Sequence, residues 1–397
     1  MTTEADANGL TITFLTLGAL FLAGFGLDAL GKRTRLPRVT LLLVLGFAVG
    51  PAALDWLPDT RWFPLVSHMA LAMVGFLLGN SLERGSLRES GRAVLWVSIT
   101  VVLATTALVA TGLMALGVAP ALALLLGALA TATDPAASSD VVREVRAEGP
   151  FTRTLLGIVA IDDAWGLIVF SVMMACAQFL AGTGSPGSAL WAGVYDVGAA
   201  VGLGVLLGVP AAYLTGRVRA GEPTLAEALG VVFVCTGVAL WLDVSFLLAA
   251  MVLGAVIANL AKHHERPFHA IEEVQWPFLI LFFVLSGASL EIGALASVGW
   301  VAAAYCALRV LGRAVGGPLG ARFAGLTPGT GWWLGVALTP QAGVALGMAL
   351  VVGRRIPEVG EAVLPIVIAS TVLFELVGPV LTRLALTRAG EVGIASG

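Results

Sequence analysis

Apolar stretches long enough to cross a membrane recur along all 397 residues, and short polar or Gly/Pro-rich segments separate them. A bilayer core of about 30 Å needs roughly 20 apolar residues per helix. Helices satisfy their own backbone hydrogen bonds, as lipid requires. The pattern predicts an all-α polytopic membrane protein with thirteen transmembrane helices, over residues 9–30, 39–54, 64–83, 93–117, 121–139, 154–181, 190–215, 224–241, 244–261, 274–296, 298–318, 329–352 and 360–382.

The composition excludes a soluble protein, because 58% of the residues are hydrophobic and only 12% are charged. A soluble domain is about 25% charged, since it must cover its surface with polar groups. A net charge of −3 gives no indication of a nucleic-acid partner. Cys176, Cys235 and Cys306 have neither a metal-binding spacing nor a disulfide pattern, and no cofactor is predicted. The acidic segment 1–8 lacks the basic region of a signal peptide.

The basic residues predict the orientation, because cytoplasmic loops carry an excess of Lys and Arg. Thirteen spans place the termini on opposite sides. With the N-terminus outside and the C-terminus in the cytoplasm of a bacterium, 17 basic residues lie inside, three lie outside (Arg61, Arg354 and Arg355) and two lie within a span. The inside residues are Lys32, Arg33, Arg35, Arg38, Arg84, Arg88, Arg92, Arg143, Arg146, Arg153, Arg217, Arg219, Lys262, Arg266, Arg322, Arg383 and Arg388.

A few charged residues fall inside the apolar spans, where each one costs about 2.5–3.5 kcal/mol and marks a transport pathway or a buried partner. Five further acids lie near span ends and are expected to reach water: Asp28, Asp196, Glu227, Asp243 and Glu291. The intramembrane charges are Asp134, Asp162, Asp163, Arg309, Arg313 and Glu375.

Two of these charges are adjacent in the sixth span. Neighbouring helical residues point about 100° apart, so one carboxylate of Asp162 and Asp163 can face a hydrated cavity while the other faces a helix. Two acids this close titrate as a coupled pair. A carboxylate that releases a proton and accepts a cation performs proton-coupled exchange. The alternative is that the two acids only neutralise Arg309 and Arg313.

Two spans contain residues that break helices. Thr133, Asp134 and Pro135 interrupt the fifth span, and the segment from Thr339 through Pro340 and Gln341 to Gly343 interrupts the twelfth. Proline frees a backbone carbonyl, and unwound backbone at membrane depth needs protein or a hydrated cavity around it. An ordinary proline kink is the alternative for either break alone.

The two breaks lie seven spans apart, which places them on helices of opposite direction. This offset predicts an inverted repeat that matches spans one to six with spans eight to thirteen. Crossed half-helices bring positive N-termini and negative C-termini together. Asp134 and an arginine then act either as ion ligands or as compensators of these dipoles.

With these residues the chain resembles the monovalent cation:proton antiporter superfamily, specifically its bacterial sodium/proton antiporters with an Asp-Asp pair. The resemblance covers nearly the whole chain. It rests on Leu36-Pro37 and the segments 46–51, 76–83, 132–135, 160–163, 282–290, 308–313 and 338–347 in this order and spacing.

The resemblance implies a dimerisation domain from residues 1–92 and 224–296, a core ion-transport domain from 93–181 and 298–386, and a connecting helix at 190–215. It assigns ion and proton binding to Asp163, with Asp162 as its neighbour and Thr133 and Asp134 beside the site. Arg309, Arg313 and Glu375 would compensate charge or couple the ions. It also implies a homodimer whose core domain moves like an elevator.

One position departs from the electrogenic relatives, which carry a lysine in the helix that corresponds to the eleventh span. Arg309 stands at the equivalent position here. Arginine does not release its proton in proteins, so a second exchanged proton would be carried by Asp162 or Glu375.

The resulting hypothesis is a secondary transporter, not an enzyme, that exchanges Na⁺ (or Li⁺ or K⁺) for H⁺ in pH homeostasis, with both ions competing for Asp163. The alternatives are a K⁺/H⁺ antiporter, a cation channel or a sensor without transport on the same scaffold. The chain ends about fifteen residues after the last span, without the nucleotide-binding domain of many potassium/proton relatives, which favours sodium.

Overall fold

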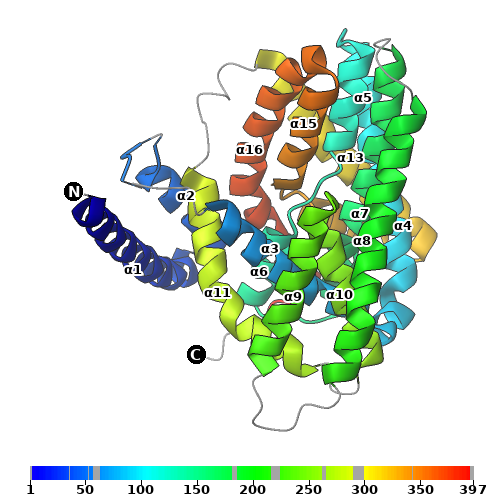
Figure 1. Ribbon diagram of the computed structural model, residues 1–397. Coiled ribbons are helices and arrows are strands. Elements are labelled where there is room, and N and C mark those ends of the chain that lie inside the picture. The colour runs from blue at the N-terminus through cyan, green and yellow to red at the C-terminus, as the bar shows by residue number, and fades with distance from the viewer. Residues whose placement is uncertain are drawn as a thin grey trace.

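The computed structural model describes residues 2–34, 36–51, 53–56, 63–180, 186–215, 224–261, 265–288, 299–341 and 343–393, and within these ranges its regular secondary structure is entirely helical (Figure 1). The helices are α1 (Thr2–Thr34), α2 (Arg38–Val49), α3 (Phe63–Gly79), the 3-10 turn η1 (Asn80–Leu82), α4 (Arg84–Ala115), α5 (Pro120–Leu129), α6 (Pro135–Glu144), α7 (Pro150–Leu180), α8 (Pro186–Thr215), α9 (Thr224–Trp241), α10 (Phe246–Leu260), α11 (Glu265–Ala288), α13 (Gly299–Ala324), α14 (Pro328–Ala337), α15 (Gly343–Arg355) and α16 (Pro357–Ala389).

Each predicted apolar span coincides with a helix or with a pair of half-helices, so the polytopic α-helical fold is confirmed. Seven helices are long and apolar enough to cross a membrane, and five apolar helices are shorter. The count of thirteen crossings stays a prediction. Helices α4 and α11 begin about nine residues before the predicted spans, at Arg84 and Glu265. Hydropathy marks only the part of a helix that lies in hydrocarbon, whereas the backbone ladder continues into the polar flanks.

The two predicted helix breaks are present. Residues 130–134 separate α5 from α6, and residues 338–341 are non-helical between α14 and α15. The breaks touch each other, since the amide of Asp134 donates to the carbonyl of Pro340 at 3.0 Å. The crossed discontinuous helices of the predicted fold are therefore confirmed.

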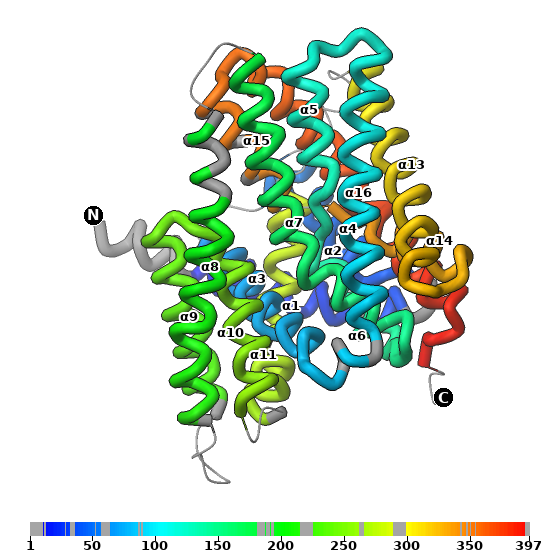
Figure 2. Tube along the Cα trace, turned by 90° about the vertical axis from the view of Figure 1, so that its right-hand side faces the viewer, coloured from blue at the N-terminus to red at the C-terminus, as the bar shows by residue number. Residues whose placement is uncertain are grey.

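The helices pack in two groups. In the first, α13 packs against α4 and α14, and α16 packs against α14 and α15, with α5 and α7 beside α4. In the second, α10 packs against α3, and α11 packs against α2, α3 and α9. Helix α8 contacts both α7 and α10. In Figure 2, α8 to α11 lie on one side of the molecule and α13 and α14 on the other.

Glycine allows a close helix contact in each group. A Cβ at Gly254 of α10 would lie 2.1 Å from the carbonyl oxygen of Phe76 on α3. A Cβ at Gly317 of α13 would lie equally close, 2.1 Å, to the carbonyl oxygen of Gly331 on α14. Small residues let membrane helices approach at backbone distance, where van der Waals packing holds them together.

Several sequence predictions lie outside the described residues. They concern Arg35, Arg61, Arg217, Arg219, Lys262 and Glu291, and the side chains of Asp28, Lys32, Arg33 and Arg354.

Candidate functional site

All six charged residues predicted inside the membrane are buried around the crossing of the two breaks. Their side chains come from four places: the first break, α7, α13 and α16. The exposed fractions are 2% for Asp134, 2% for Asp162, 6% for Asp163, 0% for Arg309, 1% for Arg313 and 6% for Glu375. Within the described residues the cluster has four carboxyl groups and two guanidinium groups. If every group is ionised, two negative charges have no counterpart in the cluster.

The end of half-helix α5 directs free carbonyl groups at the arginines of α13. Arg313 Nη2 donates to the carbonyl oxygens of Thr131 at 2.9 Å and Ala132 at 3.1 Å. Arg309 donates from Nε to Ala130 at 3.1 Å and from Nη2 to Ala132 at 2.8 Å. The last carbonyls of a helix carry partial negative charge, so cations stabilise this end.

Arg309 also connects the first break to the second. Its Nη1 donates to the carbonyl of Thr339 at 2.8 Å, and its guanidinium carbon lies 4.2 Å from the ring centroid of Phe374 on α16. Each guanidinium nitrogen of Arg309 thus has a backbone carbonyl as acceptor. This arginine holds together the two breaks, α13 and α16.

Asp162 is tied to Arg313 through a threonine. Arg313 Nη1 donates to the Thr133 hydroxyl oxygen at 3.2 Å, and that hydroxyl donates to Asp162 Oδ2. No direct bond from either arginine reaches Asp162 among the described residues. The other oxygen, Oδ1, is buried and has no described partner.

Asp163 differs from its neighbour, because no hydrogen bond or ion pair joins its carboxylate to another described residue. The charged groups near it are Asp162 and Asp134, both of its own sign. An ionised carboxylate in this position attracts a cation or a proton, since no arginine contact is available to neutralise it.

Asp134 caps the second half of the first broken helix. Its Oδ1 accepts from the amide of Ala136 at 2.9 Å, and Pro135 occupies the first position of α6. This is the preferred chemistry of a helix N-terminus, where an acid faces the positive end of the dipole. Asp134 therefore serves as the N-cap of α6. The cap uses Oδ1 and leaves Oδ2 for other contacts.

The second break carries uncharged polar groups. Gln341 Nε2 donates to the Tyr305 hydroxyl at 3.4 Å, while Gln341 Oε1 has no described partner. Glu375 lies on α16 near Asp134, and its buried Oε2 also has no described partner. Gly343 begins α15 after the break.

A cavity of about 710 Å³ leads from one end of the bundle to the first break. Thr133, Asp134 and Pro135 line it at membrane depth. Near its mouth it is lined by Asp243 of the α9–α10 loop and by Arg355 at the end of α15. We call it the funnel, and we call this end of the molecule the funnel end. Asp163 is not among the lining residues, but Asp134, whose charge acts on it, is one of them.

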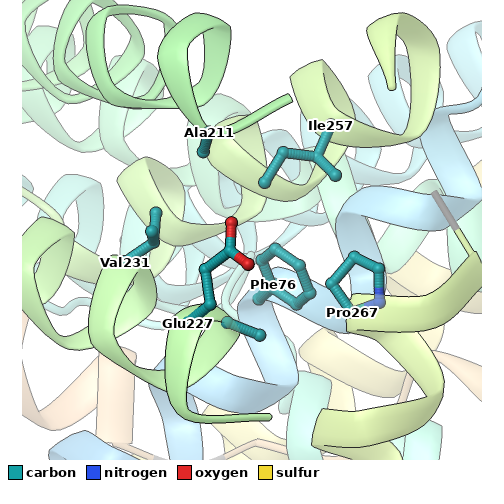
Figure 3. A pocket seen from close by; sticks show the side chains of 7 residues that line it. Phe76, Ala211, Glu227, Val231, Ile257 and Pro267 are labelled. Atoms are coloured by element: carbon teal, nitrogen blue, oxygen red, sulfur yellow. The ribbon is translucent and has the colours of Figure 1, made fainter. Parts of the chain in front are cut away.

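The three described acids predicted near span ends, Asp196, Glu227 and Asp243, are separate from the six-residue charge cluster. Asp196 and Asp243 line the funnel, and Asp196 Oδ1 accepts from the amide of Ser245 at 2.7 Å. Glu227 points into a separate pocket of about 10 Å³ between α3, α8, α9, α10 and α11 (Figure 3). A space of that size holds about one water molecule, so this pocket is not a transport site.

Sequence reasoning missed a group of charges at the opposite end from the funnel, which we call the basic-end cluster: Arg38, Asp140, Glu144 and Arg383. Asp140 is fully buried. It follows the apolar span by one residue, so hydropathy assigned it to a loop. Its position six residues after Asp134, on the half-helix that the break creates, is the signal that could have identified it.

A sequence model of the family described as "Sodium/hydrogen exchanger, transmembrane" matches residues 17–387. The chain belongs to this family. It is therefore a multi-pass membrane protein of the cation/proton antiporter class, a secondary transporter rather than an enzyme.

Among curated proteins, the chain is 24% identical to the ammonium/H⁺ antiporter subunit AmhT of Alkalihalophilus pseudofirmus, with 82% of each chain covered. It is 23% identical to the Na⁺/H⁺-K⁺ antiporter GerN of Bacillus cereus, covering 87% of this chain and 89% of GerN. The K⁺/H⁺ antiporter subunit KhtU of Bacillus subtilis is 24% identical, with 76% of each chain covered.

The fold is similar to that of the sodium proton antiporter MjNhaP1 from Methanocaldococcus jannaschii. Its pH 8 structure matches with a TM-score of 0.67 at 20% identity, covering 95% of this chain and 96% of that one. An electron-microscopy structure matches with a TM-score of 0.74 at 19% identity, covering 97% and 99%. At this identity the likeness establishes the fold.

Proposed function

We propose that the protein exchanges Na⁺ for H⁺ across the bacterial inner membrane, and that the two ions compete for Asp163. The observation that carries the proposal is the contrast between adjacent carboxylates. Asp162 is held by the Thr133 hydroxyl, whereas Asp163 has no bonded partner among the described residues. Burial without a partner favours whichever cation or proton neutralises the charge.

The ligand chemistry fits a hard monovalent cation. Carboxylate and hydroxyl oxygens suit alkali cations, and Asp163, Asp162 Oδ1 and Thr133 offer such atoms beside the funnel floor. Within the described residues no group of His, Cys, Asp and Glu is arranged to hold a resident metal ion. In this proposal the cation is a substrate that enters and leaves.

The relatives' names mention ammonium, Na⁺ and K⁺, so cation selectivity needs a direct comparison. We place Na⁺ first, with Li⁺ also accepted, and K⁺/H⁺ exchange as the second candidate. The second candidate is favoured by the similarity to KhtU.

We further propose alternating access by an elevator motion in a homodimer. Helices α4 to α7 and α13 to α16 form the moving core, and α1 to α3 and α9 to α11 form the scaffold, with α8 between them. The packing of helices within the two groups supports this division. The basic end faces the cytoplasm in this proposal, because Arg38, Arg143 and Arg383 gather there.

The test uses everted vesicles that contain the protein and an acid interior. Addition of Na⁺, Li⁺, K⁺ or NH₄⁺ should dissipate the pH gradient, with Na⁺ effective at the lowest concentration. Asp163→Asn should abolish the response to every cation. Exchange that persists in this variant overturns the assignment of Asp163, and a stronger response to K⁺ than to Na⁺ replaces the sodium proposal.

A further inference from the structure

The basic-end cluster lies far from the funnel. Arg355, which lines the funnel, directly precedes the first turn of α16, whereas Arg383 lies near the last turn of the same helix. At 1.5 Å per residue these positions are about 40 Å apart. The funnel and the basic-end cluster therefore occupy opposite ends of the bundle.

The closest ion pair of the cluster is bidentate. Arg38 donates to Asp140 from Nε at 2.7 Å and from Nη2 at 2.5 Å. The Asp140 side chain is 0% exposed and that of Arg38 is 17% exposed. The guanidinium of Arg38 also stacks on Trp276 of α11 at 3.8 Å. The planar guanidinium of Arg38 is held by two hydrogen bonds to Asp140 and by the Trp276 ring. These contacts fix the position of α6 relative to α2 and α11.

Glu144 adds a second link at the same place. Its Oε2 accepts from the backbone amide of Arg38 at 2.8 Å, and its Oε1 accepts from Arg383 at 3.1 Å. Arg38 and Trp276 belong to the scaffold, while Asp140, Glu144 and Arg383 belong to the core. The cluster thus joins the two proposed domains on the side away from the funnel.

We infer that the Arg38–Asp140 pair is the inner gate of the transport path, which closes the basic end while the funnel is open. The inference rests on the proposed function. Sliding of the core past the scaffold separates α6 from α2, so the pair exists only in the funnel-open state. A contact made in one state alone sets the balance between the two states.

A neighbouring ion pair provides a matched control. Arg143 of α6 contacts Glu272 of α11 at 3.5 Å and also joins the core to the scaffold. Its side chains are 27% and 47% exposed, and its single contact has no fork geometry. Exposed pairs of this kind contribute little, because water screens them. Loss of this pair should leave the balance between the states unchanged.

Ser138 offers a reporter inside the closed end. It lies on α6 between Asp134 and Asp140, it is 0% exposed, and its hydroxyl has no described partner. Ser171 lines the funnel and reports the open end. Each serine is replaced by cysteine, one at a time, in a full-length background without the native cysteines at 176, 235 and 306.

The experiment measures the rate at which each reporter reacts with a small water-soluble maleimide in proteoliposomes. The gate is removed by Arg38→Gln with Asp140→Asn, which discards both charges together because a single buried charge left alone destabilises the fold. Arg38→Lys keeps the charge but lacks the fork. Arg143→Gln with Glu272→Gln serves as the control, and the midpoint of thermal unfolding shows that each variant is folded.

Removal of the gate should speed labelling of Ser138→Cys about fivefold or more, the range of an ordinary coupling between states, and slow labelling of Ser171→Cys. Arg38→Lys should have a smaller effect in the same directions, and the control pair should have none. Unchanged rates in a folded gate variant overturn the inference, as does faster labelling of both reporters, which indicates local loosening. Absence of exchange in the wild type contradicts the proposed function instead.

Discussion

The two helix breaks occupy equivalent places in the inverted repeat, yet their chemistry differs. We call the first break together with α7 the first half-site, and the second break together with α16 the second half-site. The first contains Asp134 and, on α7, the Asp162–Asp163 pair, whereas the second contains Thr339 and Gln341 and, on α16, Glu375. The repeat supplies the crossed architecture, and a few differences between the halves place the Asp-Asp pair, the proposed cation site, in one half only.

Arg309 and Arg313 also contact the two half-sites unequally. Both guanidinium groups donate to carbonyl oxygens of the first break, and Arg309 reaches the second break at Thr339. The charges of α13 therefore stabilise the unwound backbone rather than the carboxylates directly. This arrangement leaves Asp163 without a guanidinium partner among the described residues, as the proposed competition between cation and proton requires.

The largest effect is expected at the first half-site. Asp163→Asn should reduce exchange to the background of empty vesicles, because an amide neither binds a proton nor offers a negative charge to the cation. Glu375→Gln, the matched change in the second half-site, should retain exchange. The initial rate of pH-gradient dissipation compares the two variants, and equal loss in both would remove the functional distinction between the half-sites.

Arg309→Ala should give the next largest effect, on stability. The substitution leaves the carbonyl of Thr339 without its donor and leaves the carbonyls of Ala130 and Ala132 with Arg313 alone. Each buried group that loses its hydrogen bond costs about 1–3 kcal/mol. The midpoint of thermal unfolding in detergent should fall by many degrees. Arg309→Lys keeps the charge but has fewer hydrogen-bond donors, so its unfolding midpoint should lie between those of the wild type and Arg309→Ala. A midpoint equal to that of the wild type would contradict the bridging role.

A smaller and more specific effect is expected for Glu375→Gln. The ionised cluster has two negative charges without a counterpart, and Asp163 accounts for one of them. If Glu375 carries the second proton, exchange in the wild type responds to an imposed membrane potential and exchange in the variant does not. Asp162→Asn tests the other candidate carrier of the second proton. If exchange in Glu375→Gln still responds to the membrane potential, the second proton is assigned to Asp162.

The smallest effect concerns Glu144, at the end of the α6 half-helix. Burial raises the pKa of Glu144, while the backbone amide of Arg38 and the charge of Arg383 oppose that rise. A raised acid pKa stabilises the fold below the unfolded value of about 4.5, and this contribution is lost as pH rises through the folded pKa. Unfolding midpoints from about pH 4.5 to neutral pH should therefore fall less in Glu144→Gln than in the wild type. Identical pH profiles would exclude this contribution.

The helices and both breaks could be predicted from the sequence, because lipid forces apolar runs into helices and proline with glycine interrupts them. The neighbourhood of Asp134 and the Asp162–Asp163 pair also followed from the inverted repeat. These features depend on local composition and on order along the chain. Helix formation and helix breaking depend on residues within one helix, and the crossing of the breaks depends on the symmetry of the two repeats.

The partners of the arginines could not be predicted in this way. The sequence suggested that Arg309 or Arg313 pairs with an aspartate, but backbone carbonyls of residues 130–132 and the Thr133 hydroxyl accept their hydrogen bonds. Free carbonyls appear only after a helix has unwound in three dimensions. For the same reason Asp140, placed just beyond an apolar span, gave no sign of its contact with Arg38, which is 102 residues away.

In the proposed mechanism, cation and proton compete for Asp163. The most direct measurement is the KM for Na⁺ of the purified protein in proteoliposomes as a function of pH. Competition for one carboxylate predicts that KM rises about tenfold for each unit by which the pH falls below the pKa of the site, with an unchanged maximal rate. A KM that does not depend on pH would contradict competition of the two ions at Asp163.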